Sequence, residues 1–493
     1  MKKIRWVVVI LGATLFLLSM WQILAASSGL EIVKVNSADP PMTFISPADG
    51  DADTRPLVLI GHGFAGSRVI MYGFALTFAH AGYHVALWDF EGHGTNSEPM
   101  SLDVQRDSLV EDVEAVLMDA NERGITGSGQ PAILGHSMGS GVALDFGVRH
   151  PETVATVAVS PVSRTVTINL PKNLLLLAGS NEAAFVKTAE ELLVDAGGAG
   201  GNPKNGTARM LVVIPIVEHV SILFAPQAHH AARAWVEAVS GTQPGASSYT
   251  DRRILWYGLG LVGALMVIMG LGPLLVDPLT NIQPRTPLWR RVAALVVGVI
   301  GGTFVLWVLN LFGVQLQTFM GLLVGGYVLV WCGVVGIIFW LVLWQRPEGV
   351  TGRKTLVALV IFTGLWFGIG LLGQLVWLQW LLIPKRLVIW LLGGVLLIPL
   401  FMALAEMVHG SGTLGRIGWW LFYSLVLAGG LVLVITLNPS LGVLGLILPL
   451  LPALFGFHAL AAGPYRHRWS FALSGALFLS WVIAAVFPLA NIH

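Results

Sequence analysis

The sequence predicts two fold classes in one chain: an α/β domain with a mostly parallel sheet flanked by helices, and an all-α polytopic transmembrane domain. Of the 493 residues, 55% are hydrophobic and only 11% are charged, which is too apolar for a soluble protein. The charges are also unevenly spread, because residues 31–253 hold 24 acidic and 14 basic residues, whereas residues 254–493 hold 3 and 11. We therefore expect an acidic, water-exposed part and a part embedded in lipid.

An apolar stretch without formal charge covers residues 6–30, and three basic residues precede it. This arrangement is typical of a signal peptide or of an uncleaved anchor. The stretch is longer than the apolar core of a cleaved signal, roughly 7–15 residues, and Leu24 interrupts the small-residue pattern around Ala26. We predict that residues 1–30 form a signal-anchor transmembrane helix.

Residues 31–240 alternate short apolar runs with stretches of helical apolar spacing, which is the pattern of a parallel sheet with helical crossovers. The expected strands are 57–60, 85–88, 132–134, 154–159, 174–178 and 210–216. The expected helices are 72–81, 102–123, 140–150 and 182–196. A linker over residues 241–253 follows, rich in Gly, Pro, Ser and Thr.

Residues 254–493 contain apolar segments of about 20 residues, the length that crosses a bilayer core as a helix. The sequence predicts eight such segments, at 254–276, 292–312, 321–343, 356–377, 387–407, 418–437, 441–461 and 471–489. The N-terminal anchor brings the expected total to nine. If the N-terminus is cytoplasmic, twelve Lys and Arg residues fall on the inside and four near the membrane on the outside. The positive-inside rule then places residues 31–240 on the extracytoplasmic side.

Charge and cysteine content exclude several kinds of site. The net charge of +1 conceals two opposite local balances, and neither resembles the clustered basic face that nucleic-acid binding requires. We therefore expect no nucleic-acid partner. The single cysteine, Cys332, lies within an apolar run, so the chain can build neither a disulfide framework nor a thiolate metal site.

A nucleophile motif occupies residues 135–139, where Gly135-His136-Ser137-Met138-Gly139 follows an expected strand and opens an expected helix. This matches G-x-S-x-G on a strand-to-helix turn. Glycines are needed there because the sharp turn lifts the serine hydroxyl and larger side chains would collide with adjacent backbone. The bare motif arises often by chance in a chain with 58 glycines, but the flanking strand and helix favour Ser137 as a catalytic nucleophile.

A serine nucleophile needs a base and an acid that orients the base. His219 follows the last expected strand and precedes a helix, so it is the candidate base, with His229 and His230 in that helix as reserve candidates. Glu182 lies in the loop after the expected strand 174–178 and is the candidate acid. The alternatives are a solvent-facing loop histidine at position 219 and, at position 182, an acid that only stabilises a helix N-terminus.

A second loop offers donors for the oxyanion. His62-Gly63-Phe64 stands at the end of an expected strand, where backbone N–H groups can point at developing negative charge. We predict that the Phe64 and Met138 N–H groups form the oxyanion hole. The alternative for His62-Gly63 is an ordinary turn. This chemistry requires no metal and no organic cofactor.

These motifs together resemble the α/β-hydrolase superfamily over residues 55–240, near the branch of monoacylglycerol lipases and serine aminopeptidase-like hydrolases. The resemblance rests on the 135–139 motif, on residues 89–94 (DFEGHG), which are similar to the family's D-x-x-G-H-G segment, and on the chain order Ser137, Glu182, His219. It implies an α/β-hydrolase fold with serine hydrolase activity, and structural roles for Asp89 and His93. The family more often has Asp as the acid, so Glu182 is a departure. The resemblance does not extend to residues 254–493.

The expected function is cleavage of an ester or amide through an acyl-enzyme. Many family members insert a cap where this chain has only the short connection 161–173. We therefore expect an open site that the membrane surface or outer loops near Arg252 and Lys385 complete, a small-molecule or lipid-like acyl substrate, and contacts with membrane lipids.

Two alternatives stay open. Acyl transfer to a second alcohol uses the same residues, and the chain could instead be a transporter or scaffold whose hydrolase-like domain only binds. Transport would depend on the polar residues within the apolar segments. The other interpretation is that these residues serve only helix packing and anchoring. These residues are Asp277, Asn310, Glu406, His409 and His458.

Overall fold

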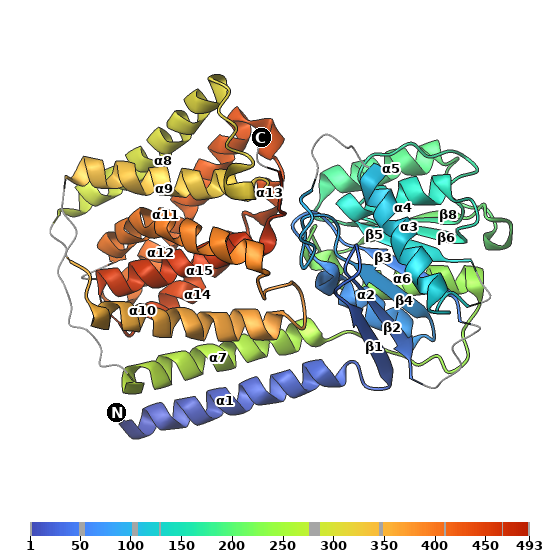
Figure 1. Cartoon of the computed structure of the whole chain (residues 1–493), viewed down its shortest axis with the longest axis horizontal. Coiled ribbons are helices and arrows are strands. Elements are labelled where there is room, and N and C mark those ends of the chain that lie inside the picture. Colours follow the sequence, from blue (N-terminus) through green and yellow to red (C-terminus); the bar gives the residue numbers. More distant parts are fainter. Residues whose placement is uncertain are drawn as a thin grey trace. The chain divides into compact units, whose positions relative to one another are not determined.

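The computed structural model describes residues 2–48, 55–100, 107–127, 130–275, 286–344, 349–408, 411–465 and 467–491. The chain divides into two compact units (Figure 1). Unit 1 comprises Met1–Met20, Tyr257–Gly373 and Trp380–His493, and unit 2 comprises Trp21–Trp256 together with the short segment Gln374–Gln379. Asp277 and His409 lie outside the described residues.

Unit 2 is built on an eight-stranded sheet with the order β1-β2-β4-β3-β5-β6-β7-β8. Strands β3 to β8 pair in parallel, whereas β1 and β2 add an antiparallel edge. The strands are β1 (Leu30–Val35), β2 (Met42–Pro47), β3 (Leu57–Gly61), β4 (His84–Trp88), β5 (Ala132–His136), β6 (Ala155–Val159), β7 (Leu174–Gly179) and β8 (Arg209–Ile214). The predicted mostly parallel sheet is therefore confirmed, with two additional strands.

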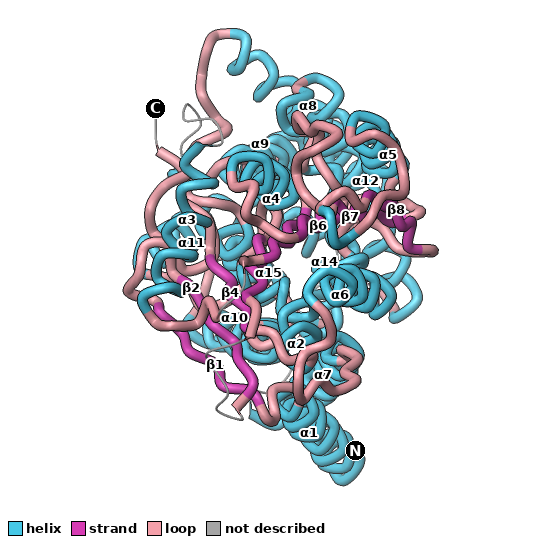
Figure 2. Tube along the Cα trace, turned by 90° about the vertical axis from the view of Figure 1, so that its right-hand side faces the viewer, coloured by secondary structure: helices cyan, strands magenta, loops and turns pink. Residues whose placement is uncertain are grey.

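Helices cover both faces of this sheet (Figure 2). They are α2 (Tyr72–His80), α3 (Asp107–Glu122), α4 (Met138–Arg149), α5 (Ala183–Asp195) and α6 (Pro226–Ser240), with short 3-10 turns η2 (Arg68–Met71), η3 (Pro203–Asn205) and η4 (Ser221–Phe224). Alternate strand residues face opposite sides: Val58 and Ile60 lie in one core with α2 and α6, whereas Leu57 and Leu59 lie in another with α3 and α4. The crossovers thus bury both faces of the parallel strands and bring their carboxyl ends to one edge.

Unit 1 is helical. Eight helices among the described residues are long and apolar enough to cross a membrane, and they indicate an integral membrane protein. They are α1 (Lys2–Ala25), α7 (Arg253–Leu275), α8 (Leu288–Leu311), α9 (Gly325–Leu343), α10 (Gly352–Leu365) continued by the π-helical turn η6 (Trp366–Leu371), α11 (Pro384–Val408), α12 (Thr413–Leu437) and α15 (Arg468–Val486). The first residues of α7 and the last of α1 belong to unit 2.

The predicted helix at 441–461 is not a single element. The structure has the 3-10 turn η7 (Pro439–Leu441), the single-turn helix α13 (Leu444–Ile447) and the 13-residue helix α14 (Leu450–Ala462) there. Pro449 precedes α14, and a proline has no backbone N–H and clashes with the preceding helical turn, so it ends α13. Another 3-10 turn, η5 (Phe319–Gly321), precedes α9.

Candidate active site

Ser137 stands on the turn between β5 and α4 with a left-handed backbone, φ 53° and ψ −117°. Few non-glycine residues adopt such a conformation, which costs about 1–3 kcal/mol and occurs mainly at functional sites. The turn also requires its glycines: a Cβ on Gly135 would lie 1.9 Å from the Gly139 carbonyl oxygen, and one on Gly139 would lie 2.5 Å from the His62 carbonyl oxygen. The predicted strand, turn and helix around Ser137 are therefore present.

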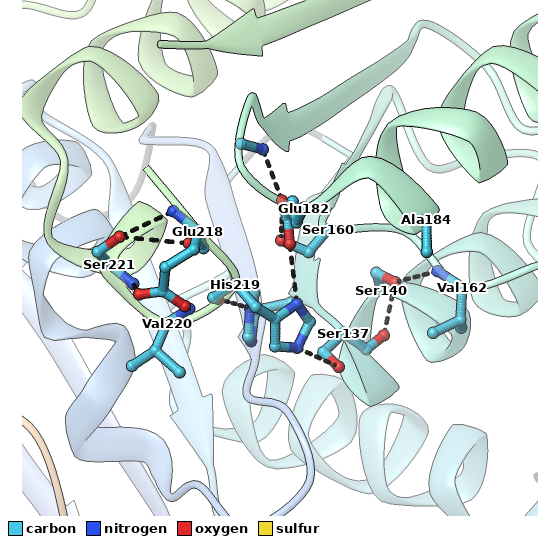
Figure 3. Close-up of polar contacts among 12 residues, drawn as sticks. Ser137, Ser140, Ser160, Val162, Glu182, Ala184, Glu218, His219, Val220 and Ser221 are labelled. Carbon is cyan, nitrogen blue, oxygen red and sulfur yellow. Dashed lines mark hydrogen bonds and ion pairs between the residues drawn. The ribbon is translucent and has the colours of Figure 1, made fainter. Parts of the chain in front are cut away.

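His219 lies between β8 and η4, and its ring reaches Ser137 (Figure 3). The His219 Nε2 atom is 3.0 Å from Ser137 Oγ, and its Nδ1 atom is 3.0 Å from Glu182 Oε2. Phe185, in the first turn of α5, stacks on the ring at a centroid distance of 4.3 Å. The structure thus joins the three predicted residues in one chain of hydrogen bonds, although they are 82 and 37 residues apart in sequence.

Glu182 follows β7 and directly precedes α5, and it is 7% exposed. Its Oε1 atom accepts hydrogen bonds from the Gly179 N–H at 2.5 Å and from the Ser160 hydroxyl at 2.8 Å. With His219 Nδ1, three hydrogen-bond partners therefore surround this buried carboxylate. Because Oε1 is occupied by these two donors, Oε2 is held toward His219. Ser160 was not singled out by the sequence analysis.

His136, the residue before the serine, supports the loop that carries His219. Its Nε2 atom is 2.9 Å from the His219 backbone oxygen, so Nε2 carries the proton and donates it to that carbonyl. Burial, followed by the proximity of the His219 ring, lowers the pKa of His136 well below its usual range. His136 is therefore neutral near pH 7 and acts as a fixed donor. Its place inside the G-x-S-x-G motif was the available signal, but the motif does not specify this residue.

The predicted oxyanion loop lies against the serine. A Cβ on Gly63 would be 3.1 Å from Ser137 Cβ and 2.8 Å from His136 Nδ1, so only glycine allows this approach. His62 holds the loop: its Nε2 accepts the Phe90 N–H at 3.2 Å, which leaves the proton on Nδ1 for the Gly63 carbonyl at 2.8 Å. Burial lowers the pKa of His62 and keeps this neutral form. The roles of the Phe64 and Met138 N–H groups stay predictions.

The D-x-x-G-H-G segment stabilises the same region. Asp89 is fully buried and accepts hydrogen bonds from the Arg68 N–H at 2.8 Å and from the N–H and hydroxyl of Thr95 at 2.9 and 2.8 Å. The ring of His93 packs edge-on against Phe64. These contacts are structural and do not reach Ser137.

The reserve histidines have other partners. His229 is buried beside Phe74, with its Nε2 atom 2.8 Å from the Leu223 carbonyl oxygen, and His230 contacts the Thr250 hydroxyl at 3.3 Å. Within the part of the chain that the structure describes, no group of three or more His, Cys, Asp or Glu side chains could hold a metal ion.

Comparison with known proteins gives a family match that lies within unit 2. Residues 52–199 match the family model of serine aminopeptidase, S33. Monoacylglycerol lipase from Mycolicibacterium smegmatis is 29% identical over 114 residues, which are 22% of this chain and 39% of that relative. The matched region thus spans less than half of the relative's own length.

Solved structures resemble less than half of this chain. A soluble variant of monoglyceride lipase from Saccharomyces cerevisiae, in complex with a substrate analogue, is 13% identical with a TM-score of 0.32, covering 45% of this chain and 97% of that chain. A membrane phospholipase A, described as a bacterial virulence factor, is 16% identical with a TM-score of 0.34, covering 47% of this chain and 93% of that chain.

Proposed function

We propose that this chain, which carries an α/β-hydrolase domain of the serine aminopeptidase and monoacylglycerol lipase type, is a membrane-bound serine hydrolase that cleaves an ester or amide through an acyl-enzyme. The observation that carries the proposal is the Ser137–His219–Glu182 chain, with both of its hydrogen bonds at 3.0 Å. Serine hydrolases of unrelated folds use this geometry to activate a hydroxyl.

The proposed reaction proceeds in two steps. His219 Nε2 takes the Ser137 hydroxyl proton while Oγ attacks the substrate carbonyl carbon, and Glu182 stabilises the imidazolium that forms. The Phe64 and Met138 N–H groups stabilise the oxyanion, and His219 returns the proton to the leaving alcohol or amine. Water, activated by His219, then releases the acyl group from Ser137.

We further propose a lipid-like acyl ester as substrate and an extracytoplasmic position for unit 2. The substrate class is supported by the similarity to a monoacylglycerol lipase. The loop between β6 and β7 has no helix, which leaves little material for a cap. The extracytoplasmic position of unit 2 is supported by the excess of Lys and Arg in the connections assigned to the cytoplasm.

Fluorophosphonate labelling tests both the serine hydrolase activity and the side of the membrane on which unit 2 lies. A membrane-impermeant probe applied to intact cells should label the full chain, Ser137→Ala should abolish labelling, and the exposed-serine control Ser163→Ala should label like the wild type. Undiminished labelling of Ser137→Ala would refute the nucleophile. Labelling only after permeabilisation would refute the orientation and leave the hydrolase assignment intact.

A further inference from the structure

Unit 2 contains a second concave site that the proposed reaction does not use. This pocket has a volume of about 260 Å³, and every residue that lines it belongs to unit 2. Its polar lining includes Lys34, Arg68, Arg253, Gln374 and Gln379, together with the hydroxyl-bearing Ser27 and Tyr72. A polar cluster of three cationic and two amide side chains is the donor set that recognises an oxyanion such as a phosphate group.

The pocket is built from the ends of candidate membrane helices. Leu24 is in the last turn of α1, Arg253 is the first residue of α7, and Gln374 follows the candidate span Gly352–Leu371 by three residues. Helix ends of this kind lie at the level of the lipid headgroups. The apolar remainder of the wall includes Leu24 and Leu375, so the pocket is suited to an amphiphile with an anionic head.

The two arginines are held in place by carboxylates. Arg253 Nε and Nη2 donate to the two oxygens of Asp251, each at 2.8 Å, and Nη1 donates to the Leu375 carbonyl at 3.3 Å. Burial alone would raise the pKa of Asp251, but the adjacent guanidinium more than offsets this and lowers it to about 2. Asp251 is therefore ionised and balances the charge of Arg253.

Arg68 has unused hydrogen-bonding capacity. It is 4% exposed, its Nη2 donates to Asn36 Oδ1 at 2.5 Å, and its Nη1 forms an ion pair with Asp89 Oδ2 at 3.5 Å. Among the described residues, Nη1 has no hydrogen-bond acceptor. A buried guanidinium donor without an acceptor is costly, and a ligand oxygen in the pocket would satisfy it.

The charges of the pocket do not cancel. Asp89 and Asp251 balance the two arginines, whereas the exposed Lys34 forms no ion pair with any described residue. The lining therefore has a net charge of about +1, which complements the single negative charge of a phosphodiester. Gln374 and Gln379, whose side chains are hydrogen-bonded to each other at 2.6 Å, add uncharged polar surface.

We propose that this pocket binds the phosphodiester headgroup of an anionic phospholipid, with the lipid chains along the apolar wall. The site is distinct from Ser137, so lipid binding and hydrolysis can fail independently.

The test is native mass spectrometry of the full chain in detergent, carrying Ser137→Ala so that no lipid is cleaved. The wild-type pocket should retain phosphatidylglycerol in preference to phosphatidylcholine with the same acyl chains. Lys34→Glu should weaken phosphatidylglycerol retention about thirtyfold, since losing a basic residue near an anionic lipid and gaining an acidic one each cost roughly 1 kcal/mol. Lys34→Arg keeps the charge and should keep the affinity. Lys204→Glu makes the same charge change in the exposed η3 turn and should also bind normally.

Three results would overturn the proposal. They are unchanged retention in Lys34→Glu, equal weakening in Lys204→Glu, and displacement of phosphatidylglycerol by excess inorganic phosphate, which would show that the site takes the free anion. Because Lys34 is exposed, the melting temperature of Lys34→Glu should match that of Lys204→Glu, which separates loss of binding from loss of folding.

Discussion

Replacing Glu182 with glutamine should inactivate the protein by reversing the hydrogen bond to His219. The amide can adopt only one orientation, because the Gly179 N–H and the Ser160 hydroxyl both donate to the Oε1 position at 2.5 and 2.8 Å. The amide nitrogen must then occupy the Oε2 position, 3.0 Å from His219 Nδ1. Since an amide N–H donates, Nδ1 becomes an acceptor and the ring proton moves to Nε2, which faces Ser137 Oγ at 3.0 Å.

In that tautomer His219 has no lone pair for the serine proton. The corresponding acid-to-amide change in a Ser-His-Asp triad lowers kcat about ten-thousand-fold, which corresponds to roughly 5 kcal/mol of transition-state stabilisation. We expect a similar loss for Glu182→Gln in the fluorophosphonate labelling rate and in hydrolysis of a chromogenic ester by the purified full chain.

The matched control is Glu218→Gln, one residue from His219. Among the described residues, the Glu218 carboxylate accepts the local Val220 and Ser221 N–H groups, at 2.9 and 2.8 Å, and does not bond to the triad, so this variant should retain activity within about threefold. A Glu182→Gln protein that melts like the wild type and keeps more than a tenth of its activity would refute the argument that Glu182 sets the His219 tautomer.

Three other predictions concern Ser160, Asp112 and the backbone of Ser137. Ser160→Ala removes one donor to Glu182 and should lower kcat about tenfold with little change in KM, because a hydrogen bond to a charged group is worth about 1.5–3 kcal/mol; an equal change in both constants would contradict a positioning role. Burial, and then the adjacent Glu91, raise the pKa of Asp112 from 3.8 to about 8, so the folded state holds a proton that the unfolded state releases, and stability falls as pH rises between these values. The melting temperature of Asp112→Asn relative to wild type should therefore increase from pH 4 to pH 8, whereas a constant difference would show that Asp112 is not protonated in the fold. Ser137→Gly should be more stable than Ser137→Ala by about 1–2 kcal/mol, measured by thermal melting, because glycine adopts the left-handed turn without strain; equal stability would show that the turn is not strained.

The central fold was predictable from local signals. Short apolar runs correspond to strands β3 to β8, and the parallel arrangement brings the carboxyl ends of β5 and β7 and the loop after β8 to one edge. That convergence is why Ser137, Glu182 and His219 could be chosen from the sequence. The choice of His219 over His229 depended on its position after the last strand, outside a helix.

Other contacts between distant segments were not predictable. Strand β1 has three exposed residues, Glu31, Val33 and Lys34, and three partly buried ones, so its pairing with β2 leaves only a weak apolar alternation to detect. The hydrogen bond from His136 to the His219 carbonyl joins residues 83 positions apart, and neither motif specifies it. In unit 1, composition alone predicted a helix at 441–461, because a hydropathy average does not register the interruption at Pro449.

The buried charges of unit 1 bear on the transport alternative. Of the three acidic residues after position 253, Glu406 is the one that the structure describes, and it is fully buried. Its Oε2 atom is 2.9 Å from Arg468 Nε, and Arg291 Nη1 donates to the Glu406 backbone carbonyl at 2.9 Å. Removing one partner of such a pair leaves an uncompensated buried charge, at a cost of about 3–5 kcal/mol. The carboxylate thus joins α11 to α15 as part of the helix packing. A proton carrier would need to exchange this partner during each cycle, and the fixed ion pair favours packing over transport.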